Sequence, residues 1–155
     1  MAEIDAGTQA PAFDMPTDGG GSISLASLRG KRIILYFYPK ADTPGCTTES
    51  QDFTALSAQF AAAGAVVIGV SRDPVKALDR FKAKRDLGVV LASDETGGVT
   101  EAYGVWGEKS LYGRVYMGIE RATFLIDDHG IVQRTWRKVK VKAHAAAVLT
   151  AVQAG

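Results

Sequence analysis

The chain has 155 residues, of which 46% are hydrophobic and 23% are charged. This length and apolar content fit one domain spanning 1–155 better than two. Lysine and arginine number 18 against 17 acidic residues, so charge alone selects no nucleic acid, anionic membrane or acidic ligand as a partner. One cysteine, no secretory signal pattern and no apolar run of membrane-spanning length predict a soluble protein of a reducing cytoplasm.

Glycine and proline break up the first thirty residues, while residues 22–25 alternate like a short strand, which predicts an N-terminal hairpin. Residues 33–38 form a continuous apolar and aromatic run, typical of a strand that is buried on both faces. A helix is then predicted from about Thr43 to Ala63, because apolar residues recur at helical spacing and Gly64 can end it.

A second fully apolar strand is predicted at 65–70. A helix follows it, with Asp73 as a cap, Pro74 at its first position and Gly88 at its end. The order of strand, helix, strand and helix favours right-handed crossovers and parallel pairing.

In the second half of the chain, a short strand is predicted at 89–91 and a short helix at 98–103. Residues 106–117 are aromatic and interrupted by glycine, which predicts a long loop packed by its own aromatic side chains. Two strand patterns, at 122–126 and 131–136, flank four turn-forming residues and predict an antiparallel hairpin.

The chain ends in a predicted helix from about Lys142, with Val148, Leu149 and Val152 on one face. Taken together, the elements predict an α/β fold. Its central sheet is mixed, helices cover both faces, and a hairpin extends the N-terminus.

Cys46, the single cysteine, falls where the 33–38 strand gives way to a helix. Thr43 and Pro44 suit the cap and first position of that helix, so Cys46 lies in the first turn, where backbone amides lack helical partners. Those amides and the helix dipole favour an anion, which makes Cys46 a candidate nucleophile. At pH 7 a free thiol is already a few per cent ionised, so a lowered pKa can raise the thiolate fraction only about thirtyfold. Larger acceleration needs groups that bind the transition state, such as the Thr43 hydroxyl or an arginine.

Motifs along nearly the whole chain resemble the peroxiredoxins. Pro39, Thr43 and Cys46 match the family's Pro-x-x-x-Thr-x-x-Cys motif. Residues 44–49 resemble the peroxiredoxin Q branch, also called the bacterioferritin comigratory proteins. The same likeness continues in four other segments, 10–13, 103–109, 118–127 and 136–142.

This resemblance implies a thioredoxin-like fold and the reduction of hydrogen peroxide and organic hydroperoxides. It implies that Cys46 is the peroxidatic cysteine, which attacks the distal peroxide oxygen and becomes a sulfenic acid. Thr43 would hydrogen-bond the peroxide, Pro39 would shield the thiolate from water, and Arg121 would stabilise the thiolate and the departing oxygen. Glu49 would orient an arginine, although a capping-box acid at that position needs no further role. The implied scheme uses no metal and no organic cofactor.

The sequence departs from this branch at the resolving cysteine. Many members carry one five residues after the peroxidatic cysteine, where this chain has Gln51; others carry it in the next helix, where the chain has Phe81, Lys82 and Lys84. A sulfenic acid on Cys46 would therefore need an external thiol: a thioredoxin, a glutaredoxin, a low-molecular-weight thiol or Cys46 of a second subunit. We expect a one-cysteine enzyme that is a monomer or weak dimer.

Two other functions remain open. A peroxide-sensing or chaperone-like interaction protein could use oxidation of Cys46 as its switch. Thiol-disulfide exchange in the thioredoxin manner is weakened because the chain has no Cys-x-x-Cys pair. Trp106, Tyr112 and Tyr116 could dock a reductase, although packing in the core or in a loop is favoured.

The remaining charged groups fit plain structural roles. His129 and His144 are too few and too far apart to suggest a metal site, and we expect both to be solvated. A basic cluster between 134 and 142 is interrupted by Val139 and Val141. It is expected to be the solvated face of a half-buried strand rather than a nucleic-acid patch.

Overall fold

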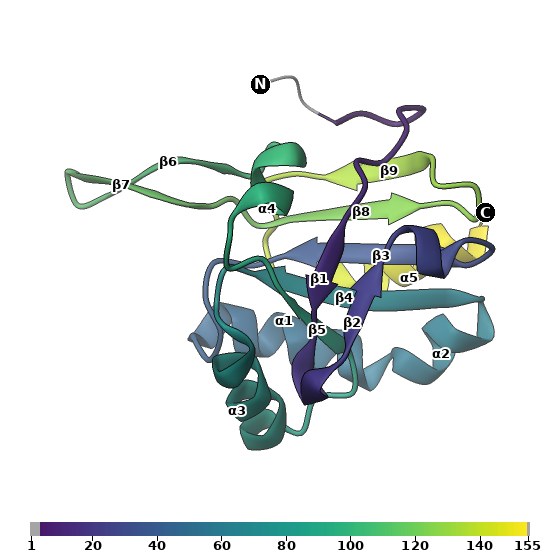
Figure 1. The fold of residues 1–155 in the computed structure, drawn as a ribbon, viewed down its shortest axis with the longest axis horizontal. Coiled ribbons are helices and arrows are strands. Elements are labelled where there is room, and N and C mark those ends of the chain that lie inside the picture. Colours follow the sequence, from purple (N-terminus) through teal and green to yellow (C-terminus); the bar gives the residue numbers. More distant parts are fainter. Residues whose placement is uncertain (1–3, 155) are drawn as a thin grey trace.

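The structure is a computed structural model that describes residues 4–154. A five-stranded mixed sheet, in the order β5-β4-β3-β8-β9, lies at its centre, and two further strand pairs lie outside it (Figure 1). The strands are β1 (Asp14–Pro16), β2 (Ser22–Ser24), β3 (Arg32–Phe37), β4 (Ala65–Ser71), β5 (Val90–Ser93), β6 (Trp106–Leu111), β7 (Arg114–Ile119), β8 (Ala122–Ile126) and β9 (Val132–Trp136). The helices are α1 (Pro44–Ala55), α2 (Ser57–Ala62), α3 (Val75–Arg85), α4 (Gly98–Ala102) and α5 (His144–Ala154), with 3-10 turns η1 (Asp18–Gly20) and η2 (Ala26–Leu28).

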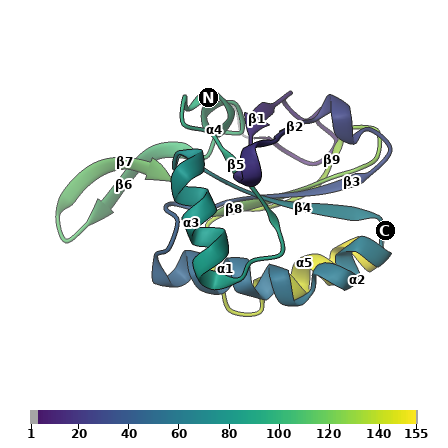
Figure 2. The same cartoon turned by 60° about the horizontal axis from the view of Figure 1, so that its bottom comes forward.

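The central strand β3 is buried on both faces, as its apolar run predicts. Ile34 and Tyr36 belong to one apolar cluster, which includes side chains of α1, α2, α3 and α5. Ile33, Leu35 and Phe37 belong to the other, which lies beneath the β1–β2 hairpin and α4. Figure 2 shows α1, α2 and α5 on one side of the sheet and α4 with the hairpin on the other. The predicted mixed sheet, the helices on both faces and the N-terminal hairpin are confirmed.

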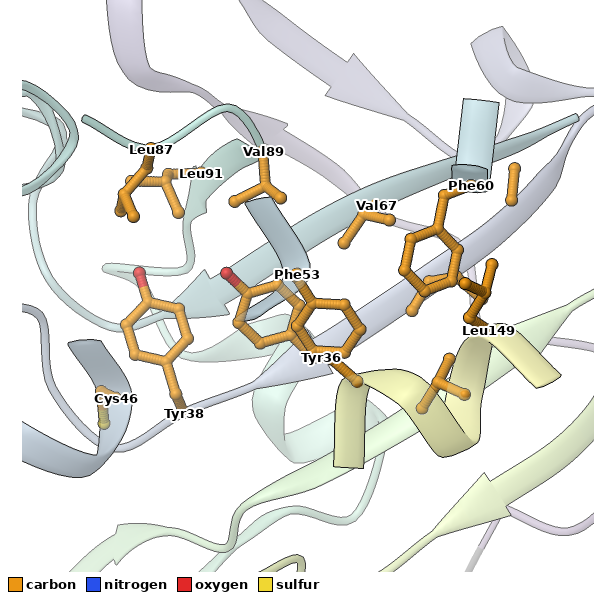
Figure 3. Packing of buried hydrophobic residues seen from close by; sticks show 14 of the residues in the cluster. Tyr36, Tyr38, Cys46, Phe53, Phe60, Val67, Leu87, Val89, Leu91 and Leu149 are labelled. Atoms are coloured by element: carbon orange, nitrogen blue, oxygen red, sulfur yellow. The ribbon is translucent and has the colours of Figure 1, made fainter. Parts of the chain in front are cut away.

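A row of aromatic side chains fastens α1 and α2 to β3 (Figure 3). The ring of Phe53 stacks on Tyr36 with 4.6 Å between centroids, and Phe60 lies 5.8 Å from Phe53. Tyr38 continues the row, and Cys46 lies beside it at the start of α1 (Figure 3). Offset rings of this kind add stability beyond their buried area, so the helix that carries Cys46 is held firmly against the sheet.

The helix predicted from Thr43 to Ala63 is divided in two at Leu56. The hydroxyl of Thr54 donates to the carbonyl of Ser50 at 2.8 Å and accepts the N–H of Gly88 at 3.0 Å. Such back-bonding by threonine competes with regular helix geometry. Gly64, at φ 76°, ends the second segment as predicted.

The helix predicted over 74–88 is shorter than expected. Asp86 takes the left-handed conformation at φ 52° and ends α3, so Gly88 lies beyond it. The carboxylate of Asp73 does not cap the helix; it accepts the N–H of Ala41 at 2.7 Å. An aspartate can adopt this conformation through its short polar side chain, which is why the expected glycine signal misplaced the end.

The prediction of a loop over residues 106–117 is wrong, because this segment forms the two-stranded β6–β7 ribbon. The ribbon extends away from the body of the protein (Figure 1). Only its base is packed: Ile119 is buried, and the ring of Trp106 lies 3.4 Å from the guanidinium carbon of Arg72. Farther out, neither face of the ribbon covers a core, so its sequence lacks the apolar alternation by which strands are usually predicted.

The basic cluster between 134 and 142 does not continue a strand, contrary to expectation. β9 ends at Trp136, and the segment that follows is irregular. Arg137 donates to the carboxylate of Glu120 at 2.9 Å, and the N–H of Val139 donates to the carbonyl of Arg121 at 3.0 Å. The predicted β8–β9 hairpin itself is confirmed.

The expectation that both histidines are solvated holds for His129 and is wrong for His144. His144 begins α5 and is buried, with its Nε2 atom 2.8 Å from the hydroxyl oxygen of Thr123. Burial lowers the pKa of His144 to about 4. The C-terminal helix is confirmed, with Val148 and Val152 buried. Within residues 4–154, no helix has both the length and the apolar character needed to cross a membrane.

Candidate active site

Cys46 lies in the first turn of α1, as the sequence predicts. Thr43 is extended and occupies the cap position, and Pro44 is the first helical residue. The side chain of Cys46 is 1% exposed. Its sulfur accepts a hydrogen bond from Nη2 of Arg121 at 3.4 Å. The thiol is therefore held in a dry setting beside a permanent cation.

Sheet topology brings Arg121 to Cys46, although the two residues are 75 positions apart in the sequence. β8 runs antiparallel to β3, with Ala122 opposite Phe37. Arg121 directly precedes β8, so it lies beside the carboxyl end of β3, where the chain turns into the loop that leads to Cys46. The two residues thus reach the same edge of the sheet from opposite directions.

Glu49 completes a buried chain of contacts with these two residues. It lies three positions after Cys46 on α1, and residues at that spacing share one helix face. Its Oε1 atom accepts a hydrogen bond from Nη1 of Arg121 at 2.6 Å. Arg121 therefore uses one terminal nitrogen on the carboxylate and the other on the sulfur, so Glu49 is placed to fix the direction of the guanidinium.

Burial dominates the electrostatics of the Glu49 carboxyl, which is 1% exposed. Burial raises its pKa to about 7, and the opposing effect of Arg121 is too small to cancel the shift. Among the described residues, its second oxygen, Oε2, has no hydrogen-bond partner. For Arg121, burial opposes the charged form, but the neighbouring Glu49 and Cys46 outweigh it and raise the pKa. The guanidinium is thus charged at every working pH.

The raised pKa of Glu49 predicts a pH-dependent stability. The folded pKa of about 7 lies above the value of about 4.3 in an unfolded chain. The folded state therefore binds the extra proton, and this contribution to stability is lost as the pH rises through that window. We expect the free energy of unfolding of the wild type to fall, relative to Glu49→Gln, by on the order of 2 kcal/mol from about pH 4.5 to about pH 7.5.

Urea denaturation of both proteins at several pH values measures this difference. His144 has a folded pKa of about 4, below its unfolded value of about 6.5, so it contributes stability that is lost as the pH falls. Because this slope opposes that of Glu49, the difference between the two proteins is the informative quantity. A difference that stays constant across the window would contradict the assignment.

The structure places Thr43 directly before α1 and Pro39 in the loop that leads to it, and the threonine hydroxyl is engaged differently from a helix cap. Oγ1 of Thr43 donates to the carbonyl of Lys40 at 2.8 Å, and the side chain makes no capping hydrogen bond. Pro39 is half-buried and lines a cavity of about 470 Å³ together with Arg121. Cys46 does not line this cavity, but Arg121, which contacts its sulfur, does.

Two features of the site were missed by sequence reasoning. A Cβ atom on Gly45 would lie 3.2 Å from Nη2 of Arg121, so glycine lets the guanidinium approach the first turn of α1. Asp42, at φ 62°, bonds Lys84 at 2.8 Å and Arg85 at 2.9 Å, which ties the loop before Cys46 to α3. The partners of Gly45 and Asp42 are 76 and more than 40 positions away, so local patterns carry no sign of them.

This fold and this buried thiol with its arginine define a thioredoxin-like protein with one buried cysteine that contacts a guanidinium. The model of the AhpC/TSA family matches residues 6–135. A putative peroxiredoxin Bcp of Coxiella burnetii is 50% identical over 94% of this chain and 97% of its own. The peroxiredoxin Bcp of Bacillus subtilis is 47% identical over 94% and 93%, respectively.

Solved structures of the same group of proteins are similar to this chain along nearly its whole length. The bacterioferritin comigratory protein of Xanthomonas campestris, a structure concerned with alkyl peroxide reduction, has a TM-score of 0.90 and 45% identity, covering 97% of this chain and 98% of that one. A cysteine-to-serine variant of peroxiredoxin Q from Xylella fastidiosa has a TM-score of 0.94 and 36% identity, covering 99% and 98%. The chain therefore belongs to the AhpC/TSA family, in its Bcp or peroxiredoxin Q branch, as the motifs predict.

The solved Xanthomonas campestris relative differs from this chain in its cysteines. It has been studied as serine variants of two different cysteines, whereas this chain has only Cys46. No second thiol of the same chain can reach Cys46, whatever its conformation.

Proposed function

We propose that this protein is a thiol-dependent peroxidase in which Cys46 is the only reacting sulfur. The Cys46 sulfur attacks the distal oxygen of a hydroperoxide, and the O–O bond breaks. Sulfur gives up two electrons and becomes a sulfenic acid, while the departing oxygen takes the proton that the thiol released and leaves as an alcohol or water. The hydrogen-bonded chain Cys46–Arg121–Glu49 is the observation that carries this proposal.

Arg121 supplies the electrostatic part of the mechanism. Negative charge moves from sulfur to the departing oxygen during the attack, and a fixed cation beside both atoms stabilises the transition state most. Nη2 of Arg121 lies 3.4 Å from Sγ of Cys46, and Nη1 is held by Glu49, so the guanidinium does not need to reorganise when the charge moves. Arginine also remains protonated at all relevant pH values.

Thr43 and Pro39 are proposed to position the substrate and to limit water. Oγ1 of Thr43 donates its hydrogen to the carbonyl of Lys40, which leaves its lone pairs free to accept the O–H of a hydroperoxide. That hydrogen bond would hold the peroxide with its distal oxygen toward Cys46. Pro39 has no N–H and an apolar ring, so it can cover the thiol without offering water a partner.

Recovery of Cys46 is proposed to use an external thiol. The thiol attacks the sulfenic acid, a mixed disulfide forms and water leaves. A second thiol then attacks the external sulfur of the mixed disulfide, so that Cys46 returns as a thiol and the reductant leaves as a disulfide. The single cysteine of the chain supports this route.

Peroxide consumption with separate reductants tests the proposal. We expect multiple turnovers of hydrogen peroxide and of an organic hydroperoxide when thioredoxin, glutaredoxin or glutathione is supplied with its own recycling system. If Cys46 oxidises once and none of these thiols supports a second turnover, the peroxidase proposal fails. That outcome would favour the second candidate, a peroxide sensor or chaperone-like protein that uses Cys46 oxidation as a switch.

We also propose a cytoplasmic protein that works as a monomer or weak dimer. Cys46 must return to the thiol form in every cycle, which suits a reducing compartment. Pro39, Thr43, Cys46, Glu49 and Arg121 all come from one chain, so the chemistry needs no second subunit.

A further inference from the structure

The β6–β7 ribbon exposes a group of apolar side chains beside the active site. Tyr112 is 98% exposed and Val115 is 62% exposed; the other exposed large apolar residues of the described chain lie on the same ribbon, at Leu111, Tyr116 and Met117. Soluble proteins rarely gather large apolar side chains on a projecting strand pair with free edges unless a partner covers them. The exposed apolar side chains of the ribbon therefore indicate a surface that a partner covers.

The turn of the ribbon indicates that Tyr112 is present for a reason other than local stability. Leu111 pairs with Arg114, so Tyr112 and Gly113 form a two-residue turn, and both have positive φ, at 51° and 76°. Such turns favour asparagine followed by glycine, and a bulky residue at positive φ is strained. Local stability would thus select asparagine at position 112, yet the chain holds an aromatic ring in solvent there. Strain combined with full exposure points to a binding role.

The ribbon also forms one wall of the cavity that reaches the site. Glu108, Lys109 and Ser110 of β6 line this cavity together with Pro39 and Arg121. A partner resting on the ribbon would thus lie next to Arg121, the residue that contacts the Cys46 sulfur on which a reductant has to act.

The charged residues around the ribbon favour a different protein over a second copy of this chain as the partner that covers it. The ribbon carries Lys109 and Arg114 against Glu108, and Lys138 lies across the cavity. The nearby acid Glu120 is already paired with Arg137. Two copies meeting through this surface would bring like charges together, and each would offer only another buried Cys46. An acidic partner fits better.

We propose that the β6–β7 ribbon docks a protein thiol reductant of the thioredoxin class, one that presents an apolar surface with an acidic rim around its reactive cysteine. The inference rests on the proposed peroxidase function and names the partner of the same site. Apolar contact with the ribbon holds the reductant, and the cationic side chains orient it. The chemistry is the thiol attack on the sulfenic acid of Cys46 described above, with water as the leaving group.

A ribbon variant tests the proposal, with Leu111→Thr, Tyr112→Asn and Val115→Thr combined. Threonine suits strands, and asparagine suits the turn, so the variant is designed to keep the ribbon folded. We expect kcat/KM for thioredoxin to fall at least about tenfold. The rate with dithiothreitol, and the single oxidation of Cys46 by peroxide, should stay unchanged.

A pair of charge reversals provides the matched control. Arg114→Glu should lower the rate with thioredoxin and weaken its dependence on salt. Lys31→Glu, at the opposite end of β3, should do neither. Unchanged turnover of the ribbon variant with thioredoxin would overturn the inference, as would wild-type turnover with dithiothreitol but not with thioredoxin. If sedimentation showed that the wild type is a dimer and the ribbon variant is a monomer, the inference would be overturned, because a second copy of the chain would then be the partner of the ribbon. Failure of Cys46 to react with peroxide would instead refute the proposed function.

Discussion

Replacing Cys46 with serine is expected to abolish thiol-dependent peroxide consumption, with a loss of at least about a thousandfold. A serine hydroxyl is a weak nucleophile without a strong base beside it, and the side chain next to Cys46 is the permanently protonated Arg121, which cannot serve as a base. The chain has no other cysteine that could take over. Peroxide consumption at saturating reductant measures this loss.

Stability supplies the control for this variant. Serine is close to cysteine in size, and aromatic packing of Phe53 on Tyr36 holds α1 against the sheet, so the fold should persist. Circular dichroism and urea unfolding should show a folded protein. Activity of the folded serine variant equal to that of the wild type would remove Cys46 from the mechanism.

Replacing Arg121 with glutamine is expected to lower kcat/KM for hydroperoxide by roughly a hundredfold to a thousandfold. The change removes the fixed cation that contacts the Cys46 sulfur, and removal of one such group typically has an effect of this size. Arg121→Lys should recover little, because an ammonium group cannot reproduce the two-pronged contact with Glu49 and Cys46. Stopped-flow measurement of Cys46 oxidation separates this effect from recycling.

Loss of Arg121 also leaves the Glu49 carboxyl buried without its partner. Since that carboxyl has a pKa of about 7, it can take up a proton, and we expect a destabilisation of about 2 kcal/mol. The double variant Arg121→Gln with Glu49→Gln should regain much of the stability and none of the activity. Arg134→Gln, at an exposed arginine of β9, should keep both. Activity that recovers together with stability would show that Arg121 acts only structurally.

The elements that surround the core could be predicted because burial leaves a mark in sequence. β3 and β4 are continuous apolar runs, and the β8–β9 hairpin is marked by turn residues between two strand patterns. Where no core is covered, this signal disappears, which is why the β6–β7 ribbon was taken for a loop. Helix ends were misplaced where Asp86 replaced a glycine signal and where the Thr54 hydroxyl bonded back to its own helix.

The candidate site residues could be predicted from sequence motifs, but the contacts between them are seen only in the structure. Cys46 in the first turn of α1 follows from Thr43 and Pro44. The approach of Arg121 depends on the register of β8 against β3, which sequence does not contain. The burial of His144 and the role of Gly45 depend in the same way on distant partners, Thr123 and Arg121.

Mass spectrometry of the intact protein after one equivalent of peroxide, without any thiol, tests the central claim most directly. The account predicts a gain of one oxygen atom, located on the peptide that contains Cys46, trapped by a reagent selective for sulfenic acid and removed by added thiol. An oxygen atom found on another residue, or a Cys46 that stays reduced while peroxide disappears, would contradict it.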